Sequence, residues 1–285
     1  MTALDEIGLI ASREIRKNLR SLKGLILVGL SLLGAIIVTV VKIKADEFQQ
    51  GKLAEDNNIG PEKIHELQEY ALTQVYGDPQ MGKHLANAPT VLYALLMVTI
   101  WLCPLVVLVL GFDGIPADLQ HRSVRYWTVR TRRGSYFTGK VVGLWTVVAL
   151  LTLMMHLLIA GVTLIQGGSG TAPAGSTLGW GVQFYLATLP ISAAWCGLGT
   201  LISAQFRSPI YAMLVTAAGF ASLFVLQAVG RLWQLKALLY VYPNWYDALL
   251  LSPRIERVGL GALVCFGISA AATALGTFLF ARSDV

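Results

Sequence analysis

Six long apolar runs alternate with polar segments along the 285-residue chain. A helix needs roughly 20 apolar residues to cross a hydrocarbon core about 30 Å thick, and each run approaches that length. Because lipid offers the backbone no hydrogen bonds, these runs must be helical. We therefore predict an all-α, polytopic membrane protein that forms a single transmembrane domain over residues 1–285. The predicted spans are residues 24–41, 91–111, 141–165, 184–204, 209–229 and 258–280.

The composition agrees with a membrane protein. Hydrophobic residues make up 55% of the chain, charged residues 13%, and the mean hydropathy is +0.63, which is unusual for a soluble domain of this size. Cys103, Cys196 and Cys265 all fall inside predicted spans. A thiol there behaves as a small apolar group, so the cysteines predict neither a disulfide framework nor a redox role.

Lysine and arginine are concentrated on one side of the predicted spans. An even number of spans places both termini on the side that also holds residues 112–140 and the connection 205–208. That side carries 13 of the 22 Lys and Arg residues but only 6 of the 16 Asp and Glu residues. Positive charge gathers on the cytoplasmic side of a membrane. We therefore predict a multi-pass protein of the cytoplasmic (inner) membrane with both termini in the cytoplasm.

Residues 2–22 have the pattern of an amphipathic helix. Apolar residues from Leu4 to Leu22 recur at spacings of three and four, and the cations fall largely off that line. We expect an elbow helix that lies in the cytoplasmic membrane interface and turns into the first span. The alternative is a solvated helix that packs on a soluble partner. The cations assigned to the membrane interface are Arg13, Arg16, Lys17 and Arg20.

Two further polar segments are predicted on the opposite side of the membrane. Residues 42–89 carry five Lys and eight acidic residues, and Pro61 and Gly77 are suited to the start and the end of a helix. We expect a small helical cap there. Residues 230–257 are rich in Trp and Tyr, which favour the headgroup level. They predict an interfacial or re-entrant pair of short helices, or else an ordinary loop with an aromatic belt.

Residues 134–140, GSYFTGK, imitate a phosphate-binding loop. The next residue is Val141, where the motif needs a hydroxyl for Mg²⁺, and a membrane span follows. We reject nucleotide binding at this place. We expect the Lys140 side chain to extend to the membrane interface, and Gly139 with Gly143 to form a small face for close helix contact.

Candidate chemistry inside the spans is sparse. Met154, Met155 and His156 would suit a soft metal, with Cys103 as a conceivable fourth ligand, although a Met pair in an apolar helix is usually packing. His156 is the one mid-span ionisable residue besides thiols and tyrosines, and we expect it to be a structural histidine. The chain therefore predicts no catalytic group, no metal and no cofactor of its own.

The most informative stretch is residues 112–140, an aromatic and basic segment between two spans. If it is helical, Val124 and Trp127 share a face, with Tyr126 and Val129 to either side. An aromatic knob surrounded by arginine is typical of a protein-binding hot spot. The alternatives are a strip that binds anionic lipid and, less well supported because the run is short, a nucleic-acid site. The candidate contact residues are Asp118, Arg122, Val124, Arg125, Tyr126, Trp127 and Arg130.

The chain resembles the membrane permease subunits of type-2 ABC transporters, an exporter-type family with six spans per subunit. One part of the resemblance is the N-terminal ASREIRKNLRS segment, and another is the SAQFRSP turn between spans four and five. The third is Asp113 and Asp118 followed by a basic stretch that ends in Gly139-Lys140. Many members have Glu where this chain has Asp118, and Gly-Thr where it has Ser123-Val124.

The resemblance implies that residues 118–130 form a coupling helix that docks on a separate ATP-binding subunit. The complex would hold two ATPases, which bind the ATP and Mg, and two permeases, the same or related, that meet through spans one and five. This chain would not be an enzyme, and it would bind lipid but no nucleic acid. Its uncharged spans favour export of an apolar or amphipathic substrate. Alternatives are an ATPase-driven mechanical role in an envelope assembly and an intramembrane enzyme that uses His156.

Overall fold

The computed structural model describes residues 2–55, 61–165 and 174–282, and every regular element in these ranges is helical. Six of the helices are long and apolar enough to cross a membrane, which confirms the predicted fold class. The helices are α1 (Ala3–Arg20), α2 (Leu22–Glu55), α3 (Pro61–Tyr76), α4 (Pro79–Ala86), α5 (Thr90–Gly111), α6 (Pro116–Gln120), α7 (Val124–Arg130), α8 (Arg133–Ile165), α9 (Ala174–Ser203), α10 (Pro209–Leu232), α11 (Lys236–Leu239), the 3₁₀ helix η1 (Pro243–Tyr246), α12 (Asp247–Leu250) and α13 (Ile255–Arg282).

Three of the long helices extend well beyond the apolar runs that predicted them. The first continues to Glu55 through residues such as Lys, Ala, Glu and Gln, which favour the helix even in water. The third begins at Arg133 and the fourth at Ala174. Residues 166–173, between those two spans, lie outside the described residues. The hydrophobicity of the sequence locates the part of a span that lies in the bilayer, but not the residue at which its helix ends.

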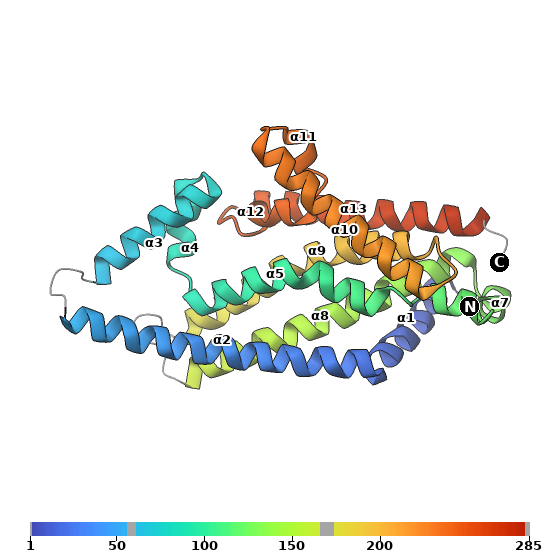
Figure 1. Cartoon of the computed structure of the whole chain (residues 1–285), viewed down its shortest axis with the longest axis horizontal. Helices are drawn as coiled ribbons and strands as arrows, with labels where there is room; N and C mark the ends of the chain where they lie inside the picture. Colours follow the sequence, from blue (N-terminus) through green and yellow to red (C-terminus); the bar gives the residue numbers. More distant parts are fainter. Residues whose placement is uncertain (1, 56–60, 166–173, 283–285) are drawn as a thin grey trace.

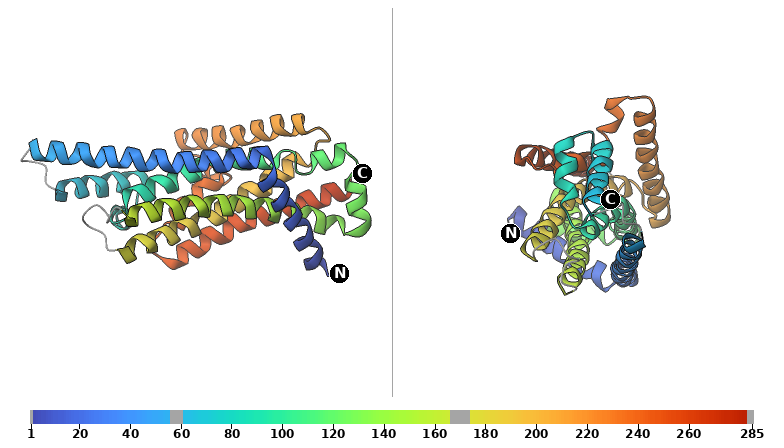
Figure 2. Two further views of the ribbon diagram at one scale, coloured as in Figure 1. Left: turned by 90° about the horizontal axis from the view of Figure 1, so that it is seen from below. Right: turned by 90° about the vertical axis from the view of Figure 1, so that its left-hand side faces the viewer.

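The long helices run side by side in one bundle, with α9 enclosed by its neighbours (Figure 1). Ala194, Trp195 and Cys196 on α9 are fully buried, whereas α2 and α10 expose long apolar faces. Both termini and α7 lie at one end of the bundle, and α3 lies at the other (Figures 1 and 2). The shared location of the termini agrees with the even number of spans.

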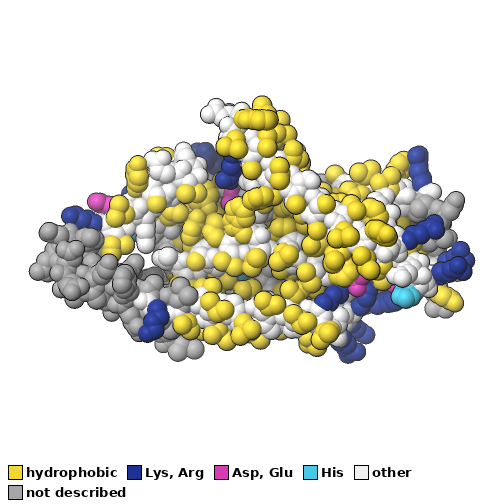
Figure 3. Space-filling view, viewed as in Figure 1, with side chains coloured by type: hydrophobic (Ala, Val, Ile, Leu, Met, Phe, Trp, Pro, Cys, Tyr) yellow, Lys and Arg dark blue, Asp and Glu magenta, His cyan; other side chains and the backbone are white. Residues whose placement is uncertain are grey.

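The surface has an apolar middle and a basic end, as expected of a protein that spans a membrane. Apolar side chains cover the middle of the bundle, and lysine and arginine gather at the end that carries α7 (Figure 3). The exposed apolar residues include Leu33, Leu214 and Leu263, which belong to three different spans. Such a broad exposed apolar surface would be a liability in water but suits contact with lipid.

Helices α1 and α8 cross at very close range because two glycines remove side chains from the contact. A Cβ atom on Gly139 would lie 2.7 Å from the Cβ of Ile10, and one on Gly143 would lie 2.7 Å from the Cβ of Glu14. The close contact predicted for this pair is therefore present, and it brings polar side chains of α1 against α8.

We predict that Gly143→Val lowers stability by about 1–3 kcal/mol, because the added methyl groups would overlap Glu14 and the carbonyl of Ala11. Gly161→Val is the matched control, since it lies on the same helix and a Cβ atom added there would meet no other atom within 4 Å. Thermal unfolding in detergent measures both variants. Equal effects of the two substitutions would contradict the close crossing.

Two aspartates at the end of the bundle opposite α7 have opposite electrostatic environments. Burial raises the pKa of the Asp247 carboxyl to about 6, and the N–H of Ala248 and the charge of Arg231 offset only part of that effect. Asp78 instead accepts hydrogen bonds from Arg257 (2.8 Å) and the Gln80 N–H (2.9 Å), which lower the pKa of its carboxyl.

These shifts predict opposite pH dependences for two Asp→Asn variants. The raised pKa of Asp247 means that stability is greatest below its ordinary value of 3.8 and is lost as pH rises towards about 6. Asp247→Asn should therefore raise the Tm most above pH 6, with the gain vanishing near pH 4. Asp78→Asn should lower the Tm at neutral pH, and that loss should shrink in acid. Parallel pH profiles for the two variants would contradict these environments.

Candidate functional site

The segment between α5 and α8 folds into a compact turn made of α6 and α7. Pro116 occupies the first turn of α6, where its missing N–H removes no helical hydrogen bond. Arg122 joins the two short helices with a left-handed φ of 56°, a conformation that costs a residue with a side chain roughly 1 kcal/mol. The surrounding contacts must hold this turn in place, because five- and seven-residue helices are not stable alone.

A buried ammonium group lies behind the turn. The Nζ of Lys140 donates to Glu14 Oε2 at 2.7 Å and to the carbonyl of Gly114 at 2.8 Å, and it lies 2.8 Å from Asp118 Oδ2. The side chains of Lys140 and Glu14 are each only 4% exposed. One cation thus joins α1, the start of the turn and α8.

The prediction that Lys140 extends to the membrane interface is wrong. Gly139 and Gly143 bring α1 so close that the carboxylate of Glu14 reaches the ammonium inside the protein. A buried charge is tolerated when it is paired and its hydrogen bonds are made, and both conditions hold here. The two glycines explain why the side chain turns inward.

Asp118 is held by hydrogen bonds from both sides as well as by the cation. The hydroxyl of Tyr136 donates to its Oδ2 at 2.6 Å, and the hydroxyl of Ser123 donates to its Oδ1 at 3.0 Å. Tyr136 belongs to α8, and Ser123 directly precedes α7. The carboxylate of Asp118 therefore joins α6 to the start of α7 and to the third span.

A second set of contacts fastens α7 to the N-terminal helix. Glu6 accepts a hydrogen bond from the backbone N–H of Arg132 at 3.1 Å. This bond and one from Ser135, which has the larger effect, hold the pKa of the Glu6 carboxyl below its ordinary value. The guanidinium of Arg13 lies over the ring of Trp127, 4.3 Å from its centroid. Such a cation–π contact stabilises by about 0.5–1 kcal/mol at an exposed site.

The outer surface of α7 is apolar and exposed. Tyr126 is 79% exposed and Val129 is 85% exposed, and Arg122 and Arg125 are exposed around them. Val124, on the other face, is fully buried. We call the surface formed by Arg122, Arg125, Tyr126 and Val129 the α7 tip.

One family model covers nearly the whole chain. The model of a family described as ABC-2 family transporter protein matches residues 9–285. The chain belongs to this family. It is therefore the transmembrane component of an ABC transporter. No curated protein matches the chain.

The structure divides the predicted contact residues of this ABC-2 permease into two groups. Arg122, Arg125 and Tyr126 are exposed. Asp118 and Val124 are buried, and Trp127 is partly buried beneath Arg13. The side chain of Arg130 lies outside the described residues. Of the elbow cations, Arg13, Arg16 and Arg20 are exposed, and Lys17 is half-buried.

Sequence reasoning missed two residues of the permease site, Glu14 and Tyr136. A signal for Glu14 was available. Ile10, Glu14 and Asn18 are spaced by four residues and share one face of α1, so an acidic residue lies on the line of a buried isoleucine. That position indicates a carboxylate that needs a buried partner.

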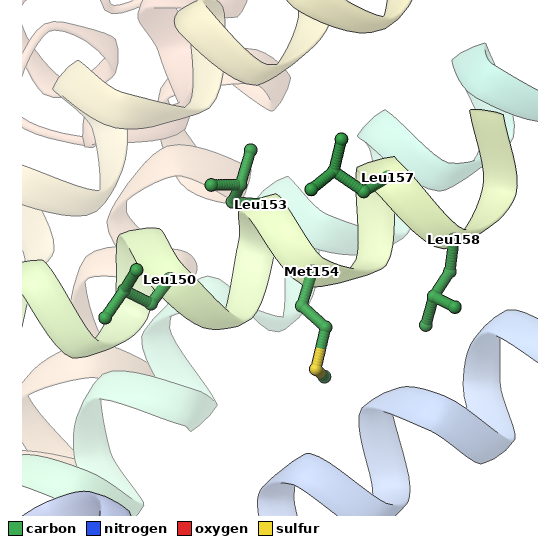
Figure 4. Close-up of a pocket in the computed structure, with 5 residues that line it drawn as sticks. All are labelled: Leu150, Leu153, Met154, Leu157 and Leu158. Atoms are coloured by element: carbon green, nitrogen blue, oxygen red, sulfur yellow. The ribbon is translucent and has the colours of Figure 1, made fainter. Parts of the chain in front are cut away.

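The structure explains why residues 134–140 do not form a phosphate-binding loop and why Met154 and His156 do not form a metal site. Residues 134–140 form the first turns of α8, and from Tyr136 onward their backbone N–H groups donate within the helix, so the segment does not form the loop that surrounds a phosphate. Met154 lines an open apolar groove with four leucines of the same helix (Figure 4). His156 lies instead near Tyr185 of α9, with 6.0 Å between ring centroids. Among the described residues, no three His, Cys, Asp or Glu side chains are grouped to hold a metal.

We predict that Lys140→Met destabilises the permease by about 3–5 kcal/mol, because two buried carboxylates lose their cation. Lys83→Met, at an exposed position, should leave the Tm unchanged. Adding Glu14→Gln to Lys140→Met should restore part of the loss, since one unpaired carboxylate is removed. If Lys140→Met unfolds at the same temperature as Lys83→Met, the buried cluster does not support the fold.

Proposed function

We propose that the α7 tip is the surface on which a separate ATP-binding subunit docks and moves this permease. The supporting observation is an exposed pair of apolar side chains, Tyr126 and Val129, on a short helix whose opposite face is anchored in the protein. Tyr and Arg are enriched in binding hot spots, where a few central side chains supply most of the affinity. The tip combines both.

The connections behind the tip suit a part that transmits force. Asp118 joins the turn to α8 through Tyr136, and Lys140 joins it to Glu14 on α1. A displaced α7 would therefore carry the third span and the N-terminal helix with it. In this account, ATP-driven association of two ATPases moves the turns of two permeases, and rigid helices pass the movement to the path between them.

We further propose a membrane location and a class of substrate. The charge bias supports a location of the α7 end and both termini in the cytoplasm, with the protein in the cytoplasmic membrane. The core between α5, α8 and α9 is built from apolar residues, which favours export of an apolar or amphipathic substrate. ATP and Mg would bind only to the partner subunits, and the second permease would be identical or related.

A second candidate function is mechanical action on an extracytoplasmic assembly. Helix α3, at the end of the bundle opposite α7, exposes an apolar face on which Leu67, Tyr70 and Val75 are 65%, 66% and 73% exposed. Such a face could contact an envelope partner while the same ATPases drive the permease. The two functions share the α7 tip and differ in whether a solute crosses the membrane.

We predict that Tyr126→Ala with Val129→Ala reduces recovery of the ATP-binding subunit with the tagged permease at least tenfold. The loss of two interface anchors costs about 2 kcal/mol or more, and 1.4 kcal/mol is a tenfold change in affinity. Tyr70→Ala with Val75→Ala is the matched control, with the same residue types similarly exposed at the other end of the bundle.

Unchanged recovery from the α7 variant, with normal insertion in the membrane, would contradict docking at the tip. Liposomes that contain the purified complex then separate the two functions. Transport requires ATP-dependent movement of a solute across the bilayer. ATP hydrolysis without any moved solute, together with a co-purifying envelope protein that the α3 variant loses, would favour the mechanical function.

A further inference from the structure

Helix α5 contains a built-in gap in its hydrogen bonding. Pro104 lies inside the helix and has no N–H. The carbonyl of Ile100, four residues earlier, is thereby deprived of its normal helical donor. Ile100 is only 2% exposed, so water does not replace that donor. A buried carbonyl without a partner would be costly, and more so within a membrane.

Asn244 supplies the missing hydrogen bond from a distant part of the chain. Its Nδ2 donates to the carbonyl of Ile100 at 3.0 Å, and its Oδ1 accepts from the indole Nε1 of Trp195 at 2.8 Å. Asn244 is 6% exposed and lies in η1 (Pro243–Tyr246). One amide thus ties the short helices between α11 and α13 to two spans, α5 and α9.

Aromatic rings enclose this amide. Trp195 packs edge-on against Phe220 of α10, with 4.8 Å between ring centroids, and against Tyr242 at 5.5 Å. Trp195 is fully buried, and Tyr242 is 3% exposed. The low-dielectric surroundings strengthen both hydrogen bonds of Asn244 and make loss of either one expensive.

The hydrogen bond from Asn244 reaches α5 at the place where this helix can bend. About two helical turns separate Pro104 from Gly111, where α5 ends, and the α6–α7 turn follows directly. A proline break is a place where a helix can bend, because one hydrogen bond of the ladder is already absent. Asn244 therefore joins residues 242–250 to α5 at the point where α5 can bend.

We propose that Asn244 is a positioning residue that couples the bend of α5 at Pro104 to the segment 242–250. This inference rests on the proposed function, in which the α6–α7 turn is moved by ATPases. Movement of the turn reaches Pro104 through the last two turns of α5. The amide of Asn244 then passes it to η1 and α12, which pack against α9 and α13.

The test measures the accessibility of a new thiol at Ser252→Cys, a nearly isosteric change at a position that is 3% exposed and lies two residues after the segment 242–250. A membrane-impermeant maleimide is applied from the extracytoplasmic side to the whole complex, with and without ATP. The same variants without the new cysteine correct for labelling of the three native thiols, which are all buried. Resting rates need no ATPase, so they test the Asn244 link even where docking at α7 fails.

We expect Asn244→Leu to raise the resting labelling rate at least tenfold and to abolish its dependence on ATP. The decisive comparison adds Pro104→Ala, which restores an N–H four residues after Ile100 and so removes the need for the amide donor. In that background the effect of Asn244→Leu should shrink at least threefold, as a double-mutant cycle for coupled residues requires. Pro104→Ala alone should weaken the ATP response with little change at rest.

Two results with Asn244→Leu would overturn the proposal. One is an unchanged labelling rate in Asn244→Leu, and the other is an equal effect of Asn244→Leu with and without Pro104. If Asn244→Leu does not reach the membrane, Trp195→Phe replaces it, because it deletes one hydrogen bond and keeps a ring in the cluster. Trp195→Phe should raise labelling severalfold regardless of Pro104, since it leaves the bond to Ile100 in place. An unchanged rate in that variant would also refute the proposal.

Discussion

The ammonium group of Lys140 is the constraint on which the geometry of the α7 end of the protein depends. It is buried with three oxygen partners from α1, the α6–α7 turn and the segment before that turn. A buried charge is stable only while its partners remain. The three elements must therefore keep their relative positions or move together. This cluster therefore determines the orientation of the exposed surface of α7.

The cluster in turn requires a close helix crossing. Gly139 and Gly143 allow α1 to approach α8 until Glu14 can reach Lys140. Larger residues would separate the helices and leave both charges without partners. Half-way along α5, an uncharged group has a similar role, because Asn244 satisfies a carbonyl that Pro104 leaves without a donor. In both places a local defect of a helix, either a missing side chain or a missing N–H, is completed by a distant segment.

Sequence patterns predicted the features that depend on neighbouring residues and missed those that depend on pairs far apart in the chain. Apolar runs of about 20 residues predicted six spans, because lipid contact demands a continuous property of neighbouring residues. The mixture of Arg, Tyr and Trp drew attention to residues 112–140 for the same local reason, but the single helix expected over residues 118–130 is two short helices joined at Arg122. Glu14 and Lys140 are 126 residues apart, and Asn244 and Ile100 are 144 apart. At the end of an apolar run, Lys140 has the sequence context of an interfacial lysine, and only the crossing with α1 makes it internal.

The central claim is that the α7 tip meets an ATP-binding subunit, and site-specific photo-crosslinking tests it most directly. A photoreactive phenylalanine analogue replaces Tyr126 in one permease and Tyr70 in another, and each is illuminated in membranes that contain the whole transporter. The account predicts a covalent adduct between the permease and the ATP-binding subunit from position 126 and none from position 70. An adduct with lipid alone from position 126, or ATPase adducts from position 70, would contradict it.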